Sequence, residues 1–303
     1  MISTRYVLGL LETKGVGKKT ARRAQKLGDE KGPIEEIPAL QQLLQRVKQK
    51  HPRTQVPRKT KIEKGLGEAD KILSRCRSND ITPLVPGNED FPTSLRDLGD
   101  CPPVVYRKGA SNRMSPAVAI VGTRSPSEYG RRCAGRLGRV FGEEEFWVIS
   151  GLALGCDAAV HGGCLEAGGK TSAILAHGLD EIHPKNHTSL AQEILDSGGA
   201  LWSEYPPGTP PRSHQYVQRN RLQTGLSRGA IIVEAGPDSG TMHTARFALE
   251  QGKMLGCLVP KDENGKGLQS GNDQLLKQGA YSVSDEEDVG HFMKRLRKDI
   301  SIS

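Results

Sequence analysis

The sequence predicts an α/β protein with a mostly parallel sheet, preceded by a small all-helical domain. From about residue 65 onward, short runs of apolar or β-branched residues alternate with segments of helical periodicity, which favours a parallel sheet covered by helices on both faces. Before residue 50, in contrast, apolar residues recur only at helical spacing. The expected organisation is a helical domain over 1–50, a basic linker over 51–64, an α/β domain over 65–285 and a C-terminal helix or tail over 286–303.

The first helical segment, residues 4–27, is interrupted by Gly-Val-Gly and therefore predicts two helices joined by a tight turn. It resembles the helix-hairpin-helix signature of small SAM-like domains, in which turn amides and the start of the second helix face a phosphate. A hairpin with a purely structural role is an equally open alternative. Residues 36–49 predict a further helix. The secondary DNA contacts expected here are Gly15, Gly17, Lys18 and Lys19.

Positive charge is concentrated at the N-terminal end of the chain. Residues 1–64 carry 16 Lys and Arg against 6 Asp and Glu, a net charge of +10, whereas the other 239 residues carry a net charge of −2. Within this region, 51–64 contains Pro52 and Pro57 and has neither helical nor strand periodicity, which indicates a linker. A basic segment of this kind favours an acidic polymer, nucleic acid first, as its partner. A solvated basic tail without a specific partner is the alternative.

The α/β region predicts eight strands and six helices. The expected strands are Pro83–Val85, Val104–Arg107, Val118–Gly122, Trp147–Ser150, Thr171–Leu175, Ala200–Ser203, Ala230–Val233 and Met254–Val259. The expected helices are 68–77, 127–141, 157–167, 188–196, 241–251 and 272–278, with a further amphipathic stretch at 288–297.

The bulk properties favour a cytoplasmic protein. The apolar runs are too short to cross a bilayer, and the N-terminus lacks the layout of a signal peptide. The six cysteines form no CxxC pair, as expected of reduced thiols in the cytosol. Cys156, His161 and Cys164 could suggest a metal site, but no second ligand pair follows, and no metal is expected.

Four segments of the α/β region share one design, in which a buried strand is followed by a glycine-containing or polar turn and then a helix. In open α/β sheets such turns gather at the carboxyl ends of the strands, where ligands bind. The candidate binding residues in these turns are Gly122, Thr123, Arg124, Ser150, Gly151, Lys185, Asn186, Ser239, Gly240 and Thr241. The turns contain neither G-x-G-x-x-G nor the Walker motif GxxxxGK[ST], so no dinucleotide or other cofactor is expected.

A second group of candidates lies between the third and fourth turns. It combines an aromatic ring with two arginines that bracket an asparagine, a mixture suited to the stacked bases and charged backbone of single-stranded nucleic acid. In the alternative reading, either arginine pairs internally with Glu204 or Glu234 and helps to hold the sheet. The residues of this group are Tyr216, Arg219, Asn220 and Arg221.

The order of motifs VGTR, SGLALGCDAAVH, HPKNH, SEYPPGTPP, QRNR, EAGPDSGTMHTA and GNDQLLKQGA resembles the DNA-processing protein A (DprA, or Smf) family from about residue 65 to 281. The resemblance implies an extended Rossmann-like fold that binds and protects single-stranded DNA. It also implies transfer of that DNA to a RecA-type recombinase in natural transformation, and a homodimer formed through the Rossmann-like domain. The candidate residues above match the family's G-[ST]-R, S-G, P-x-x-N, R-N-R and S-G-[ST] elements, and Tyr216 takes the place of the usual Phe. His183, Val217, Cys156 and His243 depart from the usual pattern.

The leading hypothesis is therefore a non-enzymatic, single-stranded DNA-binding protein. One alternative is an enzyme or sensor acting on a small nucleotide, for which Asp157, His161 and Glu234 would be the acid or base groups. In another, the basic N-terminal unit does all the nucleic-acid binding. The sequence leaves the biological setting open between transformation, general recombination and defence.

Overall fold

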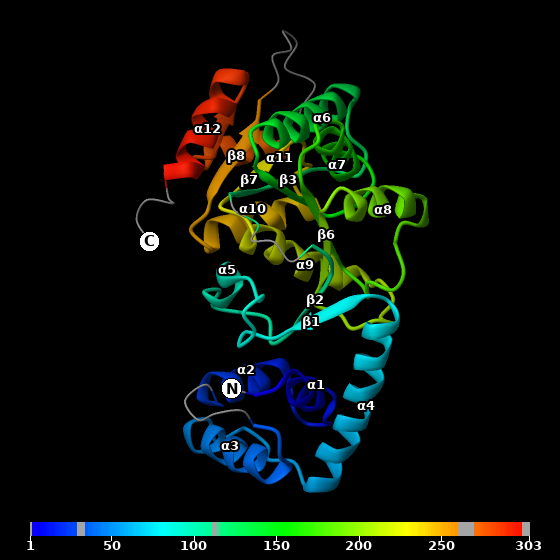
Figure 1. Ribbon diagram of the computed structural model, residues 1–303. Helices are drawn as coiled ribbons and strands as arrows, with labels where there is room; N and C mark the ends of the chain where they lie inside the picture. The colour runs from blue at the N-terminus through cyan, green and yellow to red at the C-terminus, as the bar shows by residue number, and fades with distance from the viewer. Residues whose placement is uncertain (1, 29–33, 111–113, 115, 260–269, 299–303) are drawn as a thin grey trace. The chain divides into compact units, whose positions relative to one another are not determined.

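The computed structural model describes residues 2–28, 34–110, 114, 116–259 and 270–298 (Figure 1). The chain divides into two compact units. The first comprises Met1–Lys108 and Glu204–Thr209, and the second comprises Gly109–Ser203 and Pro210–Ser303.

The described part of the first unit begins with helices α1 (Thr4–Glu12), α2 (Lys18–Gly28), α3 (Ile37–Lys50) and α4 (Lys59–Ser78). In α2, α3 and α4 the buried residues recur at helical spacing, so each of these helices turns one stripe inwards. Helix α1 is instead buried at five consecutive residues, Tyr6–Leu10. The predicted helical hairpin and the helix over 36–49 are confirmed. The unit continues with β1 (Ile81–Leu84), α5 (Thr93–Arg96) and β2 (Val105–Gly109), and β1 pairs antiparallel with β2.

Helix α4 begins at Lys59, inside the stretch for which the sequence predicts a linker. The helical spacing of its buried residues starts only at Ile62, and two glycines follow, so the helical signal is weak at this end. Gly65 is needed there, because a Cβ on it would collide with the carbonyl oxygen of Gly9 in α1. Close approach of α1 and α4 therefore outweighs the low helix propensity of glycine.

In the second unit, the strands of the described residues lie in the order β6-β5-β4-β3-β7-β8-β9. The neighbouring pairs are parallel, which confirms the mostly parallel sheet expected from the sequence. The strands are β3 (Ala117–Val121), β4 (Trp147–Ser150), β5 (Thr171–Leu175), β6 (Ala200–Ser203), β7 (Gly229–Ile232), β8 (Met254–Leu258) and β9 (Tyr281–Val283). Of these strands, β9 was not predicted.

Helices cover both faces of this sheet, with α6, α7 and α12 on one side and α9 and α10 on the other (Figure 1). Side chains of β3 alternate between the faces, as a strand requires. Val118 and Ile120 pack with α6, α7 and α12, whereas Ala119 and Val121 pack with α10 and α11. The helices are α6 (Glu128–Glu143), α7 (Cys156–Glu166), the 3-10 helix η1 (Lys185–His187), α8 (Thr188–Asp196), α9 (Ser213–Gly225), α10 (Gly240–Glu250), α11 (Ser270–Lys277) and α12 (Glu286–Lys298).

The order of the strands reverses between β3 and β7. From β3 the chain adds β4, β5 and β6 in one direction, and then returns to place β7 on the other side of β3. In open α/β sheets, ligands bind beside such a switch point, at the carboxyl ends of the strands. Three of the four predicted binding turns follow β3, β4 and β7, and the fourth follows β5, so the parallel sheet brings them all to the edge where the strands end.

None of the helices within the described ranges combines the length and apolar character needed to cross a membrane.

Candidate nucleic-acid interface

Backbone hydrogen bonds join the turns that follow β3, β4 and β7. The amide of Thr123 donates to the carbonyl of Glu234 over 2.8 Å, and the amide of Cys156 donates to the carbonyl of Thr123 over 3.1 Å. Gly122 permits this approach, because a Cβ on it would lie 2.5 Å from the sulfur of Cys156. Burial raises the pKa of the Cys156 thiol to about 12, which suits a packing role.

The turn after β7 places a carboxylate at the N-terminus of α6. Glu234 is 1% exposed, and its carboxylate accepts hydrogen bonds from the amide and hydroxyl of Ser127, at 3.0 and 2.9 Å. The Ser127 hydroxyl in turn accepts from the amide of Gly130. In Rossmann-like folds the helix after the first strand binds a phosphate at this position. Here the anion is supplied by the protein itself.

The turn after β4 has a constrained backbone. Leu152 has φ +58° and Gly155 has φ +79°, both in the left-handed region. The amide of Ala153 donates to the Asp157 carboxylate over 3.3 Å, and Nδ1 of His187 donates to the carbonyl of Leu152 over 2.9 Å. Side chains from α7 and η1 therefore hold the turn in a conformation that Leu152 would rarely adopt alone.

Beneath this turn lies a group of buried polar side chains, which we call the buried layer. Arg219 is 5% exposed and Asp157 is 4% exposed. Burial lowers the pKa of Arg219 and raises that of Asp157, while the attraction between the two charges opposes both shifts. With its amide oxygen turned inwards, Gln223 accepts from Arg219 Nη1 at 2.6 Å and from the Gly151 amide at 3.1 Å. The buried layer consists of Asp157, His161, Arg219 and Gln223.

The packing around Arg219 explains a glycine of the predicted site. A Cβ on Gly151 would collide with the guanidinium of Arg219, so only glycine fits above it. The opposite charge that acts most strongly on Arg219 is that of Asp157, a residue that the sequence-based alternative did not consider. The buried side chain of Arg219 supports the turn after β4. Sequence reasoning could not distinguish this arginine from an exposed one.

His161 is the deepest member of the buried layer. It is fully buried, and its Nδ1 donates to the Thr171 hydroxyl over 2.7 Å, because that hydroxyl already donates to the carbonyl of Val148. Burial lowers the pKa of His161 to about 3, with a further contribution from the Arg219 charge. The imidazole is therefore neutral at physiological pH.

A second set of predicted residues reaches the surface, and we call it the exposed layer. The guanidinium of Arg124 lies 4.8 Å from the ring centroid of the partly exposed Tyr216, which places a cation beside an aromatic face. Lys185 and Asn186 are exposed in η1. The exposed layer consists of Arg124, Lys185, Asn186 and Tyr216.

The N-terminus of α10 differs from that of α6 because its first turn contains no acidic residue. Ser239 is the N-cap residue, and its hydroxyl oxygen has no hydrogen-bond partner within the described part of the chain. The side-chain amide of Asn220 donates to the carbonyl of Gly240 over 3.0 Å, which ties α9 to this helix end. The backbone amides in the first turn of α10 could therefore bind an anion.

Besides Arg219, four predicted contacts have buried side chains. The Ser150 hydroxyl donates to the carbonyl of Ile120 over 2.7 Å, so it serves the sheet. The residues with side chains turned inwards are Ser150, Asn220, Arg221 and Thr241. Sequence reasoning missed the contributions of Leu152, His187 and Gln223. Leu152 and His187 fall within the quoted motifs SGLALGCDAAVH and HPKNH, but a motif does not show which of its side chains hold a turn.

In the first unit, the predicted secondary contacts lie in the turn between α1 and α2 and at the start of α2. Gly15 has φ +95°, as the tight turn requires, and Lys19 is exposed. Lys18 lies 3.8 Å from the Glu204 carboxylate and 5.5 Å from the ring centroid of Tyr205. Lys18 therefore has partners of its own within this unit.

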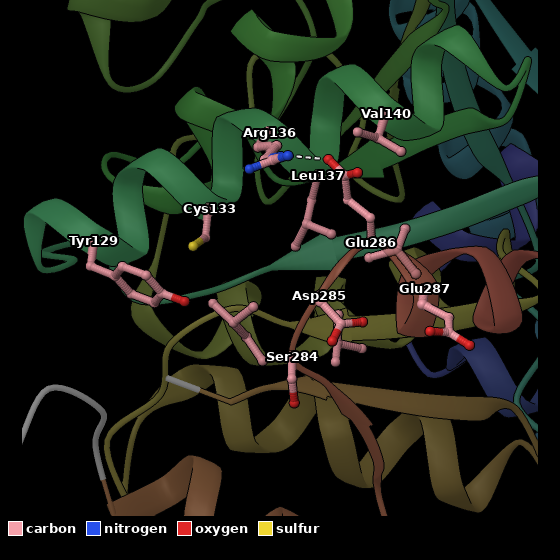
Figure 2. A pocket seen from close by; sticks show the side chains of 12 residues that line it. Tyr129, Cys133, Arg136, Leu137, Val140, Ser284, Asp285, Glu286 and Glu287 are labelled. Atoms are coloured by element: carbon pink, nitrogen blue, oxygen red, sulfur yellow. Dashed lines mark hydrogen bonds and ion pairs between the residues drawn. The ribbon is translucent and has the colours of Figure 1, made fainter. Parts of the chain in front are cut away.

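A pocket of about 500 Å³ lies between α6 and the segment that joins β9 to α12 (Figure 2). Its lining is apolar on one side, with Leu137 and Val140, and an Arg136–Glu286 ion pair lies at its edge. None of the predicted DNA contacts lines this pocket. Across the described residues, no group of three or more His, Cys, Asp or Glu side chains could hold a metal ion.

Comparison with known proteins identifies relatives for most of the chain. The family profile of the DNA recombination-mediator protein A matches residues 82–294. Protein Smf of Escherichia coli (strain K12) is 37% identical over 208 residues, which cover 68% of this chain and 55% of that protein. The DNA processing protein DprA of Bacillus subtilis (strain 168) is 31% identical over 233 residues, covering 76% and 77% of the two chains.

Solved structures give the same result. The X-ray structure of DprA from Streptococcus pneumoniae covers 95% of this chain with a TM-score of 0.78 and 26% identity, and 98% of that chain is matched. A structure of DprA from Helicobacter pylori, described for its single-stranded DNA binding mode, covers 72% of this chain with a TM-score of 0.62 and 30% identity, and 96% of that chain is matched. The chain spans only 55% and 62% of the Smf proteins of Escherichia coli and Synechocystis. The chain belongs to the DNA recombination-mediator protein A family.

Proposed function

We propose that this chain binds single-stranded DNA in the cytoplasm, protects it, and passes it to a RecA-type recombinase during DNA uptake or recombination. The observation that carries the proposal is the pairing of Arg124 with Tyr216 above a constrained turn, with Lys185 exposed in η1 of the same unit. Arginine and lysine would neutralise phosphates, and the ring of Tyr216 would stack on a base. The single-stranded DNA binding mode described for the Helicobacter pylori relative supports this assignment.

The candidate acid and base groups are committed to structural roles, which supports binding without catalysis. Glu234 caps α6, Asp157 accepts from the turn after β4, and His161 is fully buried and neutral. A general acid or base must reach the reacting group of its substrate. The nucleotide-cleaving alternative would be supported by release of a free base when the protein is incubated with nucleotides.

The decisive experiment is fluorescence anisotropy with single- and double-stranded DNA of equal length across a salt series. We expect preference for the single strand, with affinity that falls as salt rises because each neutralised phosphate releases a counterion. Equal affinity for both forms, unchanged by Arg124→Ala, would contradict the proposed interface and would assign binding to the basic N-terminal unit. Lys19→Ala then measures how much that unit contributes.

The homodimer and the recombinase partner are finer parts of the same proposal. We propose that two chains associate through the Rossmann-like unit. Sedimentation of the purified chain, alone and with single-stranded DNA, tests the dimer. The recombinase step is tested by the lag before a RecA-type protein assembles on DNA, which this chain should shorten.

A further inference from the structure

The turn after β4 carries an apolar side chain at its tip. Leu154 is 45% exposed, and Leu249 near the end of α10 is 51% exposed. They are the exposed large apolar side chains among the residues that the structure describes. A single exposed leucine is common on protein surfaces, so its surroundings must decide whether it has a role.

The backbone of the turn determines the direction in which Leu154 points. Leu152 is fully buried and has φ +58°, so the chain inverts there to place one leucine in the core and the next at the surface. Asp157 and His187 hold the peptide group that links Leu152 to Ala153, since Asp157 accepts from its amide and His187 donates to its carbonyl. Strain that the surrounding structure maintains in this way is typical of functional sites.

Gly155 fixes the position of this tip relative to the exposed layer. A Cβ on Gly155 would lie 2.5 Å from the carbonyl oxygen of Arg124, so the two turns touch through their backbones. Leu154 therefore adjoins the residue whose guanidinium lies against Tyr216. Leu249, in contrast, lies in the last turn of α10, at the opposite end from the amides of its first turn.

We propose that Leu154 contacts an unpaired base and so contributes to selectivity for single strands. The proposal rests on the proposed function, since it requires DNA at the exposed layer. Groups that bind phosphate would hold the backbone on either side of an apolar tip, and the accessible ring of an unpaired base can cover that tip. In a duplex the base faces are stacked on one another and offer no such surface.

The test compares two oligonucleotides of the same length and charge, one of normal thymidines and one in which abasic sites replace the bases. Anisotropy titrations use the full chain and the variants Leu154→Ala, Leu154→Met and, as a matched control, Leu249→Ala. We expect Leu154→Ala to weaken binding of the normal strand by about fivefold and to leave the abasic strand unaffected, because only the base contact is lost. Leu154→Met should retain affinity, and Leu249→Ala should change neither titration.

Two results would overturn the assignment while the proposed function stands. Leu154→Ala could bind both strands as the unaltered chain does, or it could lose affinity equally for both, which would mean that the turn itself had changed. Failure of the unaltered chain to prefer single strands would instead contradict the proposed function. Thermal unfolding of each variant verifies that an exposed leucine was removed without loss of the fold.

Discussion

Tyr216 and Arg219 lie three residues apart on α9, yet they belong to different layers of the candidate interface. Tyr216 is partly exposed beside the guanidinium of Arg124, whereas Arg219 is buried with Asp157 beneath the turn after β4. Arg219 belongs to the R-N-R element, and Tyr216 lies three residues before that element. The contrast teaches that a basic residue in a binding motif can stabilise the site from within. Whether such a residue supports the turn or contacts the ligand depends on whether its side chain is buried.

Removing the positive charge of the buried layer should have the largest effect of the substitutions considered. Arg219→Ala leaves Asp157 as a buried carboxylate without its cation, and we expect a loss of about 3–5 kcal/mol in the free energy of unfolding. Chemical denaturation measures this loss. The matched control is Arg246→Ala, since Arg246 is exposed on α10, where it pairs with Glu250 over 3.5 Å and lies near the Phe247 ring. This substitution should change stability by less than about 0.5 kcal/mol. Equal effects of the two substitutions would contradict the buried role.

The buried layer should also make stability depend on pH. Burial lowers the folded-state pKa of His161 to about 3 from an ordinary value of 6.5. Below pH 6.5 His161 binds a proton in the unfolded chain but not in the folded chain. The free energy of unfolding is therefore highest above that pH and decreases as the pH falls towards 3. The slope is about 1.4 kcal/mol per pH unit from this one group. Urea unfolding between pH 7 and 4 should give a shallower dependence for His161→Gln, whereas the exposed His214→Gln should leave it unchanged.

Substitutions in the exposed layer should change the affinity for single-stranded DNA and leave the stability of the fold nearly unchanged. Tyr216→Ala removes the stacking ring, and we expect single-strand binding to weaken by about 1–3 kcal/mol with a small change in melting temperature. Tyr216→Phe keeps the ring and should retain affinity in the same anisotropy titration. A large loss of affinity in Tyr216→Phe would show that the hydroxyl is the important group.

The smallest effect is expected at a single phosphate contact. Lys185→Ala should lower affinity modestly and reduce the slope of log affinity against log salt by about 0.7, the value for one phosphate of a single strand. The control is Lys170→Ala. Lys170 is exposed and comes just before β5, so it lies at the amino ends of the strands, opposite the candidate turns. If Lys170→Ala reduced the salt slope by the same amount, the positive charges of the protein would attract DNA without a defined binding site.

Much of this architecture could be predicted from the sequence because the strands of the second unit are short, apolar and separated by helical patterns. Helix α9 escaped prediction because it is buried on most sides, including Gln215, Asn220 and Leu222, and so shows no amphipathic period. The start of α4 escaped because its helical spacing begins only at Ile62.

The positions of the candidate turns could also be predicted, since parallel strands end at one edge. What could not be predicted was which side chains of those turns are buried. The burial of Arg219 depends on Gly151, Asp157 and Gln223, residues that come together only after three separate elements have packed.

Glu234 at the start of α6 has one further consequence. The fold is one that often receives the phosphate of a free nucleotide beside its first strand, and here an internal carboxylate repels that phosphate. If the chain binds single-stranded DNA as proposed, mononucleotides should therefore compete poorly with a polynucleotide that is held at many points. Its occupancy on DNA would then depend on strand length and salt, and not on the concentration of free nucleotides.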